Sequence, residues 1–223
     1  MDLEFFSSVP LFDGFEKEDL ERILKLTSRR EYSKDRILVH ENDSGESFFL
    51  ILNGKVKVTA EGQDGKEVIL SFLGPGEFFG ELALVDDEPR SANVTAVEQT
   101  TVLILHRNDF LALLETNGQM MKKFMSILSK RLRHANDQIK SLALLDVLGR
   151  IAKLMLDMAE KEGVKLLDGS VVFRRPTHQE IASMVGTSRE TVSRMISELN
   201  KSRFITISGK DIIVRKEMRE EYS

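Results

Sequence analysis

The sequence contains no cysteine, and this absence excludes several kinds of site. Disulfide bonds, iron–sulfur clusters and cysteine-ligated zinc all need thiol groups. Long apolar runs are missing too, so we expect no membrane-spanning helix. Residues 1–10 lack the basic start and apolar core of a secretory signal, so we expect a cytoplasmic protein with no membrane partner.

Catalytic motifs are also absent. The sequence has no zinc-binding histidine–glutamate motif, no phosphate-loop lysine and no nucleophile elbow. Glu81 and Arg90 could pass for an acid–base pair, but no nucleophile or metal site accompanies them. We therefore predict that the protein is not an enzyme.

The 223 residues are 41% hydrophobic and 30% charged, which is ordinary for a globular protein, and the net charge is −4. Residues 174–216 nevertheless carry nine basic and four acidic side chains. A basic stretch in a weakly acidic protein suits an anionic partner, although charge alone is equally typical of a solvated surface.

Three sequence patterns follow one another. Residues 15–28 have the apolar spacing of a short helix. Residues 30–106 contain short strand-like runs separated by Asn53-Gly54, Asp64-Gly65 and Gly74-Pro75-Gly76, and this pattern predicts a β barrel or jelly roll. From Asp109 onward the apolar period is helical. The fold class is therefore predicted to be α+β.

The helical segment carries a heptad seam, because its apolar residues alternate steps of four and three. These residues are Met121, Met125, Leu128, Leu132, Ala135, Ile139 and Leu142. So narrow a seam favours pairing with a second copy in a homodimer over an ordinary helix lying on the barrel. The pattern restarts near Asp146, so we divide the chain into a barrel (1–108), a dimerisation helix and hinge (109–145) and a third domain (146–223).

Residues 177–205 predict a helix-turn-helix. Thr177 and Glu180 form a capping box that starts a helix, and Gly186 permits the left-handed backbone of a tight turn. Ser188 can cap a second helix. The two strand-like runs in 204–216 flank a turn at Ser208–Asp211, so we predict a hairpin that makes the module a winged helix-turn-helix.

The second helix of this module has one polar face suited to reading DNA. Arginine can contact guanine with two hydrogen bonds, and glutamate can accept one from cytosine. Arg189, Glu190 and Arg194 lie on this face, although Glu190 and Arg194 could instead form a surface ion pair. The predicted DNA-contacting residues are Thr177, Gln179, Ser188, Arg189, Glu190, Thr191 and Arg194.

Residues 79–94, FGELALVDDEPRSANV, have the chemistry of a nucleotide site. Gly80 lets the backbone approach a ligand, and a helical turn from residue 81 would direct the N–H groups of Leu82 and Ala83 toward an anion. Arg90 and Ser91 add a positive charge and a hydroxyl for a phosphate. The alternative is a barrel corner in which Glu81 and Arg90 form an ion pair.

The order of barrel, FGELAL and PRSA cassette, heptad helix, LALLDVLGRIA hinge and SRETVSR helix resembles the cAMP receptor protein family of bacterial transcription regulators. The resemblance covers residues 9–214. It implies that Arg90, Ser91 and the turn bind a cyclic phosphate, and that Glu81 binds a ribose hydroxyl. It also implies that Leu70 and Ser71 line the base pocket, that Arg131 lies near the ligand, and that TGTGA-like half-sites are recognised.

The chain departs from the family at Ala135-Asn136, where the member that binds cAMP has a Thr-Ser pair touching adenine. Ala135 has no hydrogen-bonding side chain, whereas Asn136 could pair with adenine.

Three hypotheses for the function follow. The first is a cAMP-gated homodimeric regulator that binds palindromic DNA and contacts RNA polymerase.

The second hypothesis keeps the same DNA-binding architecture but replaces cAMP as the ligand. The protein would then sense another cyclic nucleotide or a dinucleotide, or it would be constitutively active. A haem sensor would need an axial ligand, and the histidines are His40, His106, His134 and His178. A lone histidine is more often structural. The third hypothesis is a cyclic-nucleotide-binding regulatory subunit, which would have no use for a base-reading helix.

Overall fold

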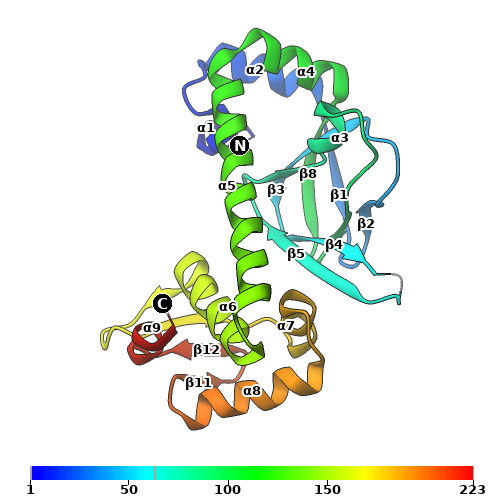
Figure 1. The fold of residues 1–223 in the computed structure, drawn as a ribbon. Coiled ribbons are helices and arrows are strands. Elements are labelled where there is room, and N and C mark those ends of the chain that lie inside the picture. Colours follow the sequence, from blue (N-terminus) through cyan, green and yellow to red (C-terminus); the bar gives the residue numbers. More distant parts are fainter. Residues whose placement is uncertain (1, 63, 223) are drawn as a thin grey trace. The chain divides into compact units, whose positions relative to one another are not determined.

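The computed structural model describes residues 2–62 and 64–222, and the chain divides into two units, Met1–Leu132 and Arg133–Ser223 (Figure 1). The predicted three-part division gives the segment 109–145 a role of its own. The division into units does not test that role, so it stays a prediction. None of the described helices is long and apolar enough to cross a membrane.

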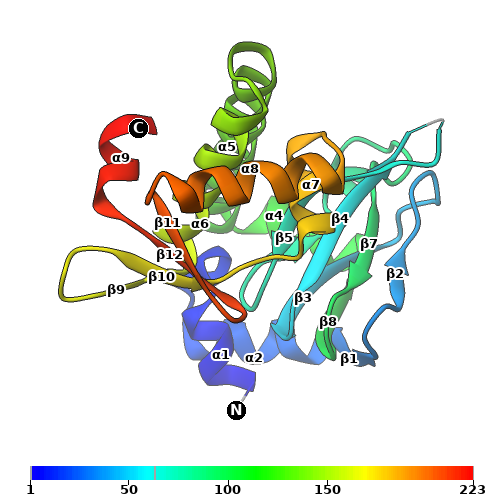
Figure 2. The same cartoon turned by 90° about the horizontal axis from the view of Figure 1, so that it is seen from below.

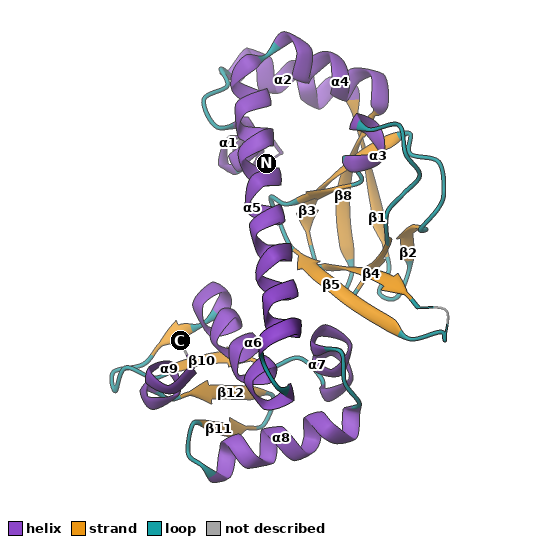
Figure 3. Ribbon diagram, in the orientation of Figure 1, coloured by secondary structure: helices purple, strands orange, loops and turns teal. Residues whose placement is uncertain are grey.

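Two antiparallel sheets dominate the described part of the first unit (Figure 3). One sheet has the strand order β1-β8-β3-β6 and the other has the order β2-β7-β4-β5. The strands are β1 (Thr27–Tyr32), β2 (Ile37–Val39), β3 (Ser47–Asn53), β4 (Val56–Glu61), β5 (Glu67–Leu73), β6 (Phe78–Phe79), β7 (Asn93–Ala96) and β8 (Thr100–His106). This arrangement confirms the predicted jelly roll.

The predicted turns fall where the glycines permit them. Gly54 follows β3 with φ +88°, and a side chain there would approach the Gln99 carbonyl oxygen to 2.4 Å. Strand alternation then directs apolar side chains between the sheets. The core so formed contains Val39, Phe49, Ile51, Val56, Leu73, Phe79, Val94 and Val102.

The helices of the first unit pack on a second, aromatic core. They are α1 (Asp2–Ser8), the 3₁₀ helix η1 (Pro10–Phe12), α2 (Lys17–Leu26), α3 (Leu82–Val85) and α4 (Arg107–Thr116). Phe48 of β3 stacks on Phe110 of α4 with ring centroids 4.4 Å apart. The helix predicted over 15–28 is confirmed as α2, whereas α1 was not predicted.

The long helix α5 (Gly118–Leu144) follows α4 after a break that the apolar period did not reveal. Asn117 makes this break, because its backbone is extended, with φ −124° and ψ +95°, and its Oδ1 caps the next helix by accepting from the Met120 N–H at 2.9 Å. Met120 and Phe124 of α5 are buried in the aromatic core. The first turns of α5 are therefore anchored on the first unit.

The second unit contains α6 (Val147–Glu162) and a sheet of strand order β11-β12-β10-β9 (Figure 2). Its other elements are β9 (Val164–Lys165), β10 (Val171–Arg174), α7 (His178–Val185), α8 (Arg189–Lys201), β11 (Ile205–Ser208), β12 (Asp211–Val214) and α9 (Lys216–Tyr222). Asp146 caps α6 by accepting from the Gly149 N–H at 2.8 Å, at the position where the apolar pattern of the sequence restarts. The predicted hairpin is confirmed, since Ser208 pairs with Asp211.

Candidate ligand site and nucleic-acid interface

The predicted one-turn helix after Gly80 is present as α3, and Gly80 has φ +81°. A β carbon at this position would lie 2.5 Å from Arg90 Nη1 and 3.0 Å from the Ser47 carbonyl oxygen. Both the backbone angle and the close contacts therefore require glycine. Arg107, which no sequence pattern singles out, donates to the Ala83 carbonyl at 3.1 Å and forms an ion pair with Asp87.

Glu81, at the start of α3, is only 3% exposed. Its Oε1 lies 2.8 Å from Arg131 Nη1, and Arg131 also donates to the Phe78 carbonyl at 2.6 Å. Burial raises the pKa of Glu81, although the charges of Arg131 and Arg90 act in the opposite direction. Arg131 thus lies beside the cassette, as the resemblance implied, and holds a buried carboxylate.

Arg90 is 6% exposed and donates to two backbone carbonyls, those of Gly80 at 2.6 Å and Ser47 at 2.8 Å. Its guanidinium carbon also lies 5.8 Å from the centre of the Phe49 ring. Burial lowers the pKa of Arg90, against the charges of Glu81 and nearby acids. Among the described residues the ion-pair partner of Glu81 is Arg131, so the alternative of a Glu81–Arg90 pair is not what the fold adopts.

The remaining predicted ligand residues are less closely joined to this cluster. Ser91 is exposed directly after Arg90, Leu82 is exposed and Ala83 is buried. Leu70 and Ser71 lie on β5, where Ser71 pairs with Val58. Ala135 and Asn136 are both exposed on α5, in the part of that helix that belongs to the second unit. The contacts therefore join Gly80, Glu81, Arg90 and Arg131.

The helix-turn-helix has the local structure that its sequence predicts. The Thr177 hydroxyl accepts from the Glu180 N–H at 3.2 Å, and the Glu180 side chain accepts from the Thr177 N–H at 2.7 Å. Gly186 ends α7 with φ +70° and ψ +52°. The Ser188 hydroxyl then caps α8 by accepting from the Thr191 N–H at 3.1 Å.

The two faces of α8 differ in chemistry. Val192, Ile196 and Leu199 are buried in the core of the second unit. The opposite side is polar, and with His178 of α7 it forms one concave surface, which we call the recognition surface. It is lined by His178, Arg189, Glu190, Ser193, Arg194 and Ser197.

Glu190 and Arg194 do not form an ion pair in the described part of the chain. Their charges are therefore available on the recognition surface. Gln179 is exposed beside His178, and Thr191 is half-buried. One contact was not foreseen from the sequence: Arg175 Nη1 lies 3.0 Å from His178 Nε2.

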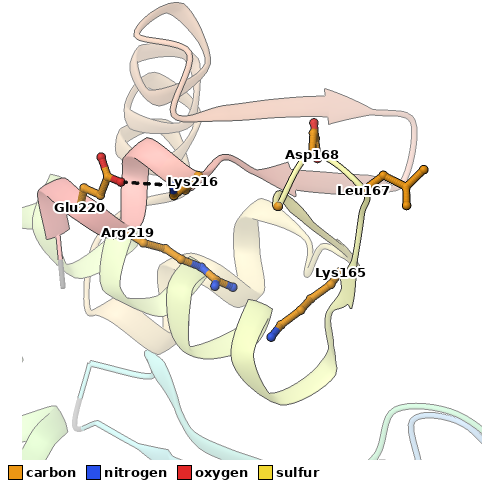
Figure 4. A pocket seen from close by; sticks show the side chains of 7 residues that line it. Lys165, Leu167, Asp168, Lys216, Arg219 and Glu220 are labelled. Carbon is orange, nitrogen blue, oxygen red and sulfur yellow. Dashed lines mark ion pairs between the residues drawn. The ribbon is translucent and has the colours of Figure 1, made fainter.

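A second concave surface lies where the β9–β10 turn meets α9 (Figure 4). Its charges are mixed and partly neutralised, because Lys216 pairs with Glu220 at 3.9 Å and Asp168 pairs with Arg215 at 3.6 Å. Lys165 and Arg219 of this surface have no ion-pair partner among the described residues, and neither have Arg189 and Arg194 of the recognition surface. The two arginines of the recognition surface lie on the second helix of the helix-turn-helix, which makes that surface the better candidate for an anionic polymer.

Comparison with known proteins identifies the family of both domains. Residues 29–117 match the cyclic nucleotide-binding domain, and residues 149–219 match the Crp-like helix-turn-helix domain. The cyclic AMP receptor protein of Thermus thermophilus is 33% identical over 93% of each chain. The cAMP-activated global transcriptional regulator CRP of Salmonella typhimurium is 34% identical, over 87% of this chain and 93% of its own. A solved structure of the c-di-GMP responsive global regulator CLP of Xanthomonas campestris has a TM-score of 0.76 at 25% identity, covering 89% of this chain and 99% of that one.

Proposed function

This chain belongs to the cAMP receptor protein family of transcription regulators, and we propose that it is a homodimer that binds cAMP and then binds a palindromic DNA site. The observation that carries the ligand proposal is the burial of two opposite charges, Glu81 and Arg90, on either side of α3. Burying a charge is costly, and such charges concentrate where a protein binds or reacts.

Both charged groups keep capacity for a nucleotide. Arginine has five N–H donors, and the two carbonyl contacts of Arg90 leave others for a phosphate. The carboxylate of Glu81 can accept several hydrogen bonds, so it can bind a ribose hydroxyl while Arg131 holds Oε1. Ser91 and the N–H groups of Leu82 and Ala83 would complete the phosphate site.

The base would be recognised by other residues. Leu70 and Ser71 are proposed to line its pocket, and Asn136 is proposed to bind adenine through its amide. Asn136 is exposed on α5, as such a role requires. Ala135 would contribute only apolar contact, so adenine would be bound with fewer hydrogen bonds than by a Thr-Ser pair.

The exposed seam of α5 supports the homodimer. Leu132 and Ile139 are 64% and 63% exposed, and Met125 and Leu142 are exposed as well. Met121 and Leu128, by contrast, are partly packed on the first unit. Large apolar side chains repeating every 3.5 residues are typical of a helix that pairs with its own copy. A two-fold dimer would place both copies of α8 in successive major grooves, about 34 Å apart.

We propose that α8 reads TGTGA-like half-sites. Arg189 and Arg194 would contact guanines and Glu190 a cytosine. Thr177, Gln179, Ser188 and Thr191 would contact phosphates or neighbouring bases, which fixes the position of the helix. RNA polymerase is proposed as the further partner of the DNA-bound dimer.

Isothermal titration with cAMP and cGMP tests the ligand proposal. We expect cAMP to bind wild type, Arg90→Ala to lose most of the affinity, and Arg22→Ala to bind as wild type does. Arg22 is a suitable control because its side chain is 78% exposed on α2 of the same unit. If cAMP gave no heat of binding with wild type, or if Arg90→Ala bound cAMP with wild-type affinity, cAMP would be refuted as the ligand.

DNA binding tests the second half of the proposal. We expect a labelled TGTGA palindrome to bind more tightly with cAMP than without it, and the affinity to fall steeply with added salt. Absence of salt-dependent binding to any such palindrome would favour a cyclic-nucleotide-binding regulatory subunit.

The alternative to cAMP is a different ligand, and the residues at 135 and 136 favour it. The pair Ala135-Asn136 lacks hydroxyl groups for adenine, and one structural neighbour is described as responsive to c-di-GMP. Titration with c-di-GMP alongside cAMP separates the two. Heat with c-di-GMP alone would support a dinucleotide sensor, and DNA binding that no ligand changes would support constitutive activity.

A further inference from the structure

His178 occupies a place in the recognition surface that gives it a role of its own. It is the first residue of α7, and it lines the same concave surface as Arg189, Glu190 and Arg194 of α8. The residues that line the recognition surface do not include the other three histidines, His40, His106 and His134. A group that titrates near neutral pH therefore lies where DNA is proposed to bind.

The contact with Arg175 fits a neutral His178 in the free protein. Arg175 Nη1 lies 3.0 Å from His178 Nε2. A guanidinium can only donate hydrogen bonds, so this contact is a hydrogen bond when Nε2 accepts, which takes a neutral imidazole with its proton on Nδ1. Burial, followed by the charges of Arg175 and Arg189, lowers the pKa of His178 below the ordinary value of 6.5.

The charged groups around His178 act in opposite directions once DNA is present. Arg175, which precedes α7, and Arg189 of α8 oppose a further positive charge on His178. Arg194 and Glu190 lie on the same surface with opposite charges, and Glu180 is held in the capping box with Thr177. DNA phosphates would add negative charge at this surface, and an anion within about 4–6 Å favours the charged form of a histidine.

We infer that His178 is a DNA-phosphate contact that takes up a proton when DNA binds. The proton comes from solvent and is added to Nε2, which then donates to a phosphate oxygen. Arg175 releases Nε2 and donates to phosphate instead. Each protomer thus gains one positive charge on binding, and DNA affinity rises as pH falls between the pKa of His178 in the complex and its lower pKa in the free protein.

This inference rests on the proposed DNA interface, and fluorescence anisotropy can test the two separately. Binding is measured between about pH 6 and pH 8 at constant ionic strength. The probes are a labelled TGTGA palindrome with saturating cAMP and a scrambled duplex at low salt, which needs no specific recognition. The variants are His178→Gln, which stays neutral, His178→Arg, which stays charged, and the control His106→Gln in the first unit.

We expect wild-type affinity to rise by up to about tenfold per pH unit for each protomer where the slope is steepest. His106→Gln should keep this dependence, while the two His178 variants should lose most of it. His178→Arg should match wild type near pH 6. The salt dependence of wild type near pH 6 should exceed that of His178→Gln by about one phosphate contact per protomer.

Three results would overturn the inference. They are a pH dependence in His178→Gln equal to that of wild type, wild-type affinity independent of pH, and binding by His178→Arg no tighter than by His178→Gln. A uniform loss of affinity in His178→Gln at every pH would also overturn it, because His178 would then only position Arg175. Failure of wild type to bind either duplex at any pH would instead refute the proposed DNA binding.

Discussion

Replacing Arg131 by methionine would leave the Glu81 carboxylate buried without its ion-pair partner. The Glu81 side chain is 4% exposed and that of Arg131 is 33% exposed. Removing one partner of a fully buried pair costs about 3–5 kcal/mol. Since Arg131 is partly solvated, water can reach some of the vacated space. We therefore expect the free energy of unfolding of the first unit to fall by about 2–3 kcal/mol.

Urea denaturation followed by tyrosine fluorescence can measure this loss in the first unit alone. The chain has two tyrosines, Tyr32 in the first unit and Tyr222 in the second, and no tryptophan. In a Tyr222→Phe background the signal comes from Tyr32. Protein concentration must be held fixed, because α5 is also the proposed dimer helix and dimerisation shifts apparent stability.

A second substitution separates the buried charge from simple loss of packing. Glu81→Gln in the Arg131→Met background removes the unpaired carboxylate, so the double variant should be more stable than Arg131→Met at neutral pH. Acidification should also reduce the difference in free energy of unfolding between wild type and Arg131→Met. The pKa of Glu81 is already raised by burial, so the folded state binds a proton more tightly than the unfolded chain, and stability is lost as pH rises through that pKa.

Several results would refute this reasoning. Arg131→Met could prove as stable as wild type, or the double variant could be no more stable than the single one. The control is Lys130→Met, because Lys130 is exposed on the same helix. We expect this control to change stability by less than about 0.5 kcal/mol. A loss in Lys130→Met as large as that in Arg131→Met would assign the effect to the helix and not to the ion pair.

Three further predictions concern the dimer seam, the turn and acid stability. Leu132→Asp should yield monomers in analytical ultracentrifugation while Lys130→Asp, on the opposite face of α5, remains dimeric; dimeric Leu132→Asp would contradict the seam. Gly186→Ala should lower thermal stability by about 1–2 kcal/mol through its left-handed backbone, since the nearest atom to the new β carbon is 3.8 Å away and causes no clash. Burial lowers the pKa of His134 and His178, both in the second unit, so their neutral forms stabilise that unit. Its urea stability, followed by Tyr222 fluorescence in a Tyr32→Phe background, should fall as pH drops below 6.5, and greater stability of this unit in acid would contradict this.

The helix-turn-helix was predictable because its signals are local. The capping box joins Thr177 and Glu180, which are three residues apart, and Gly186 ends α7 by its own backbone angle. Ser188 caps α8 through a neighbour three residues on. Each interaction closes within one turn of chain, so residue type and spacing are enough to specify it.

The contacts within the ligand site were less predictable, because they join residues far apart in the sequence. Glu81 and Arg131 are separated by 50 residues, and Arg90 reaches Ser47 across 43. Either arginine could have paired with Glu81 on charge alone. The packing of α5 on β6 brings Arg131 to Glu81, and no local sequence pattern predicts this packing. The break at Asn117 was missed for a related reason, since the apolar period continues on both sides of it.

The Glu81–Arg131 pair gives a physical route from the candidate ligand site to the proposed dimer helix. A ribose hydroxyl bound to Glu81, as we propose, would act on the same carboxylate that holds Arg131 of α5. Leu132, the next residue of α5, lies on the exposed seam. A ligand shifts a conformational equilibrium only by its difference in affinity for the two states, and moving it from 1:99 to 99:1 takes about 5.5 kcal/mol. One hydrogen bond to a charged group supplies about 1.5–3 kcal/mol, so the proposed ribose contact alone would be too weak, and the proposed phosphate binding by Arg90 would have to contribute to the same change.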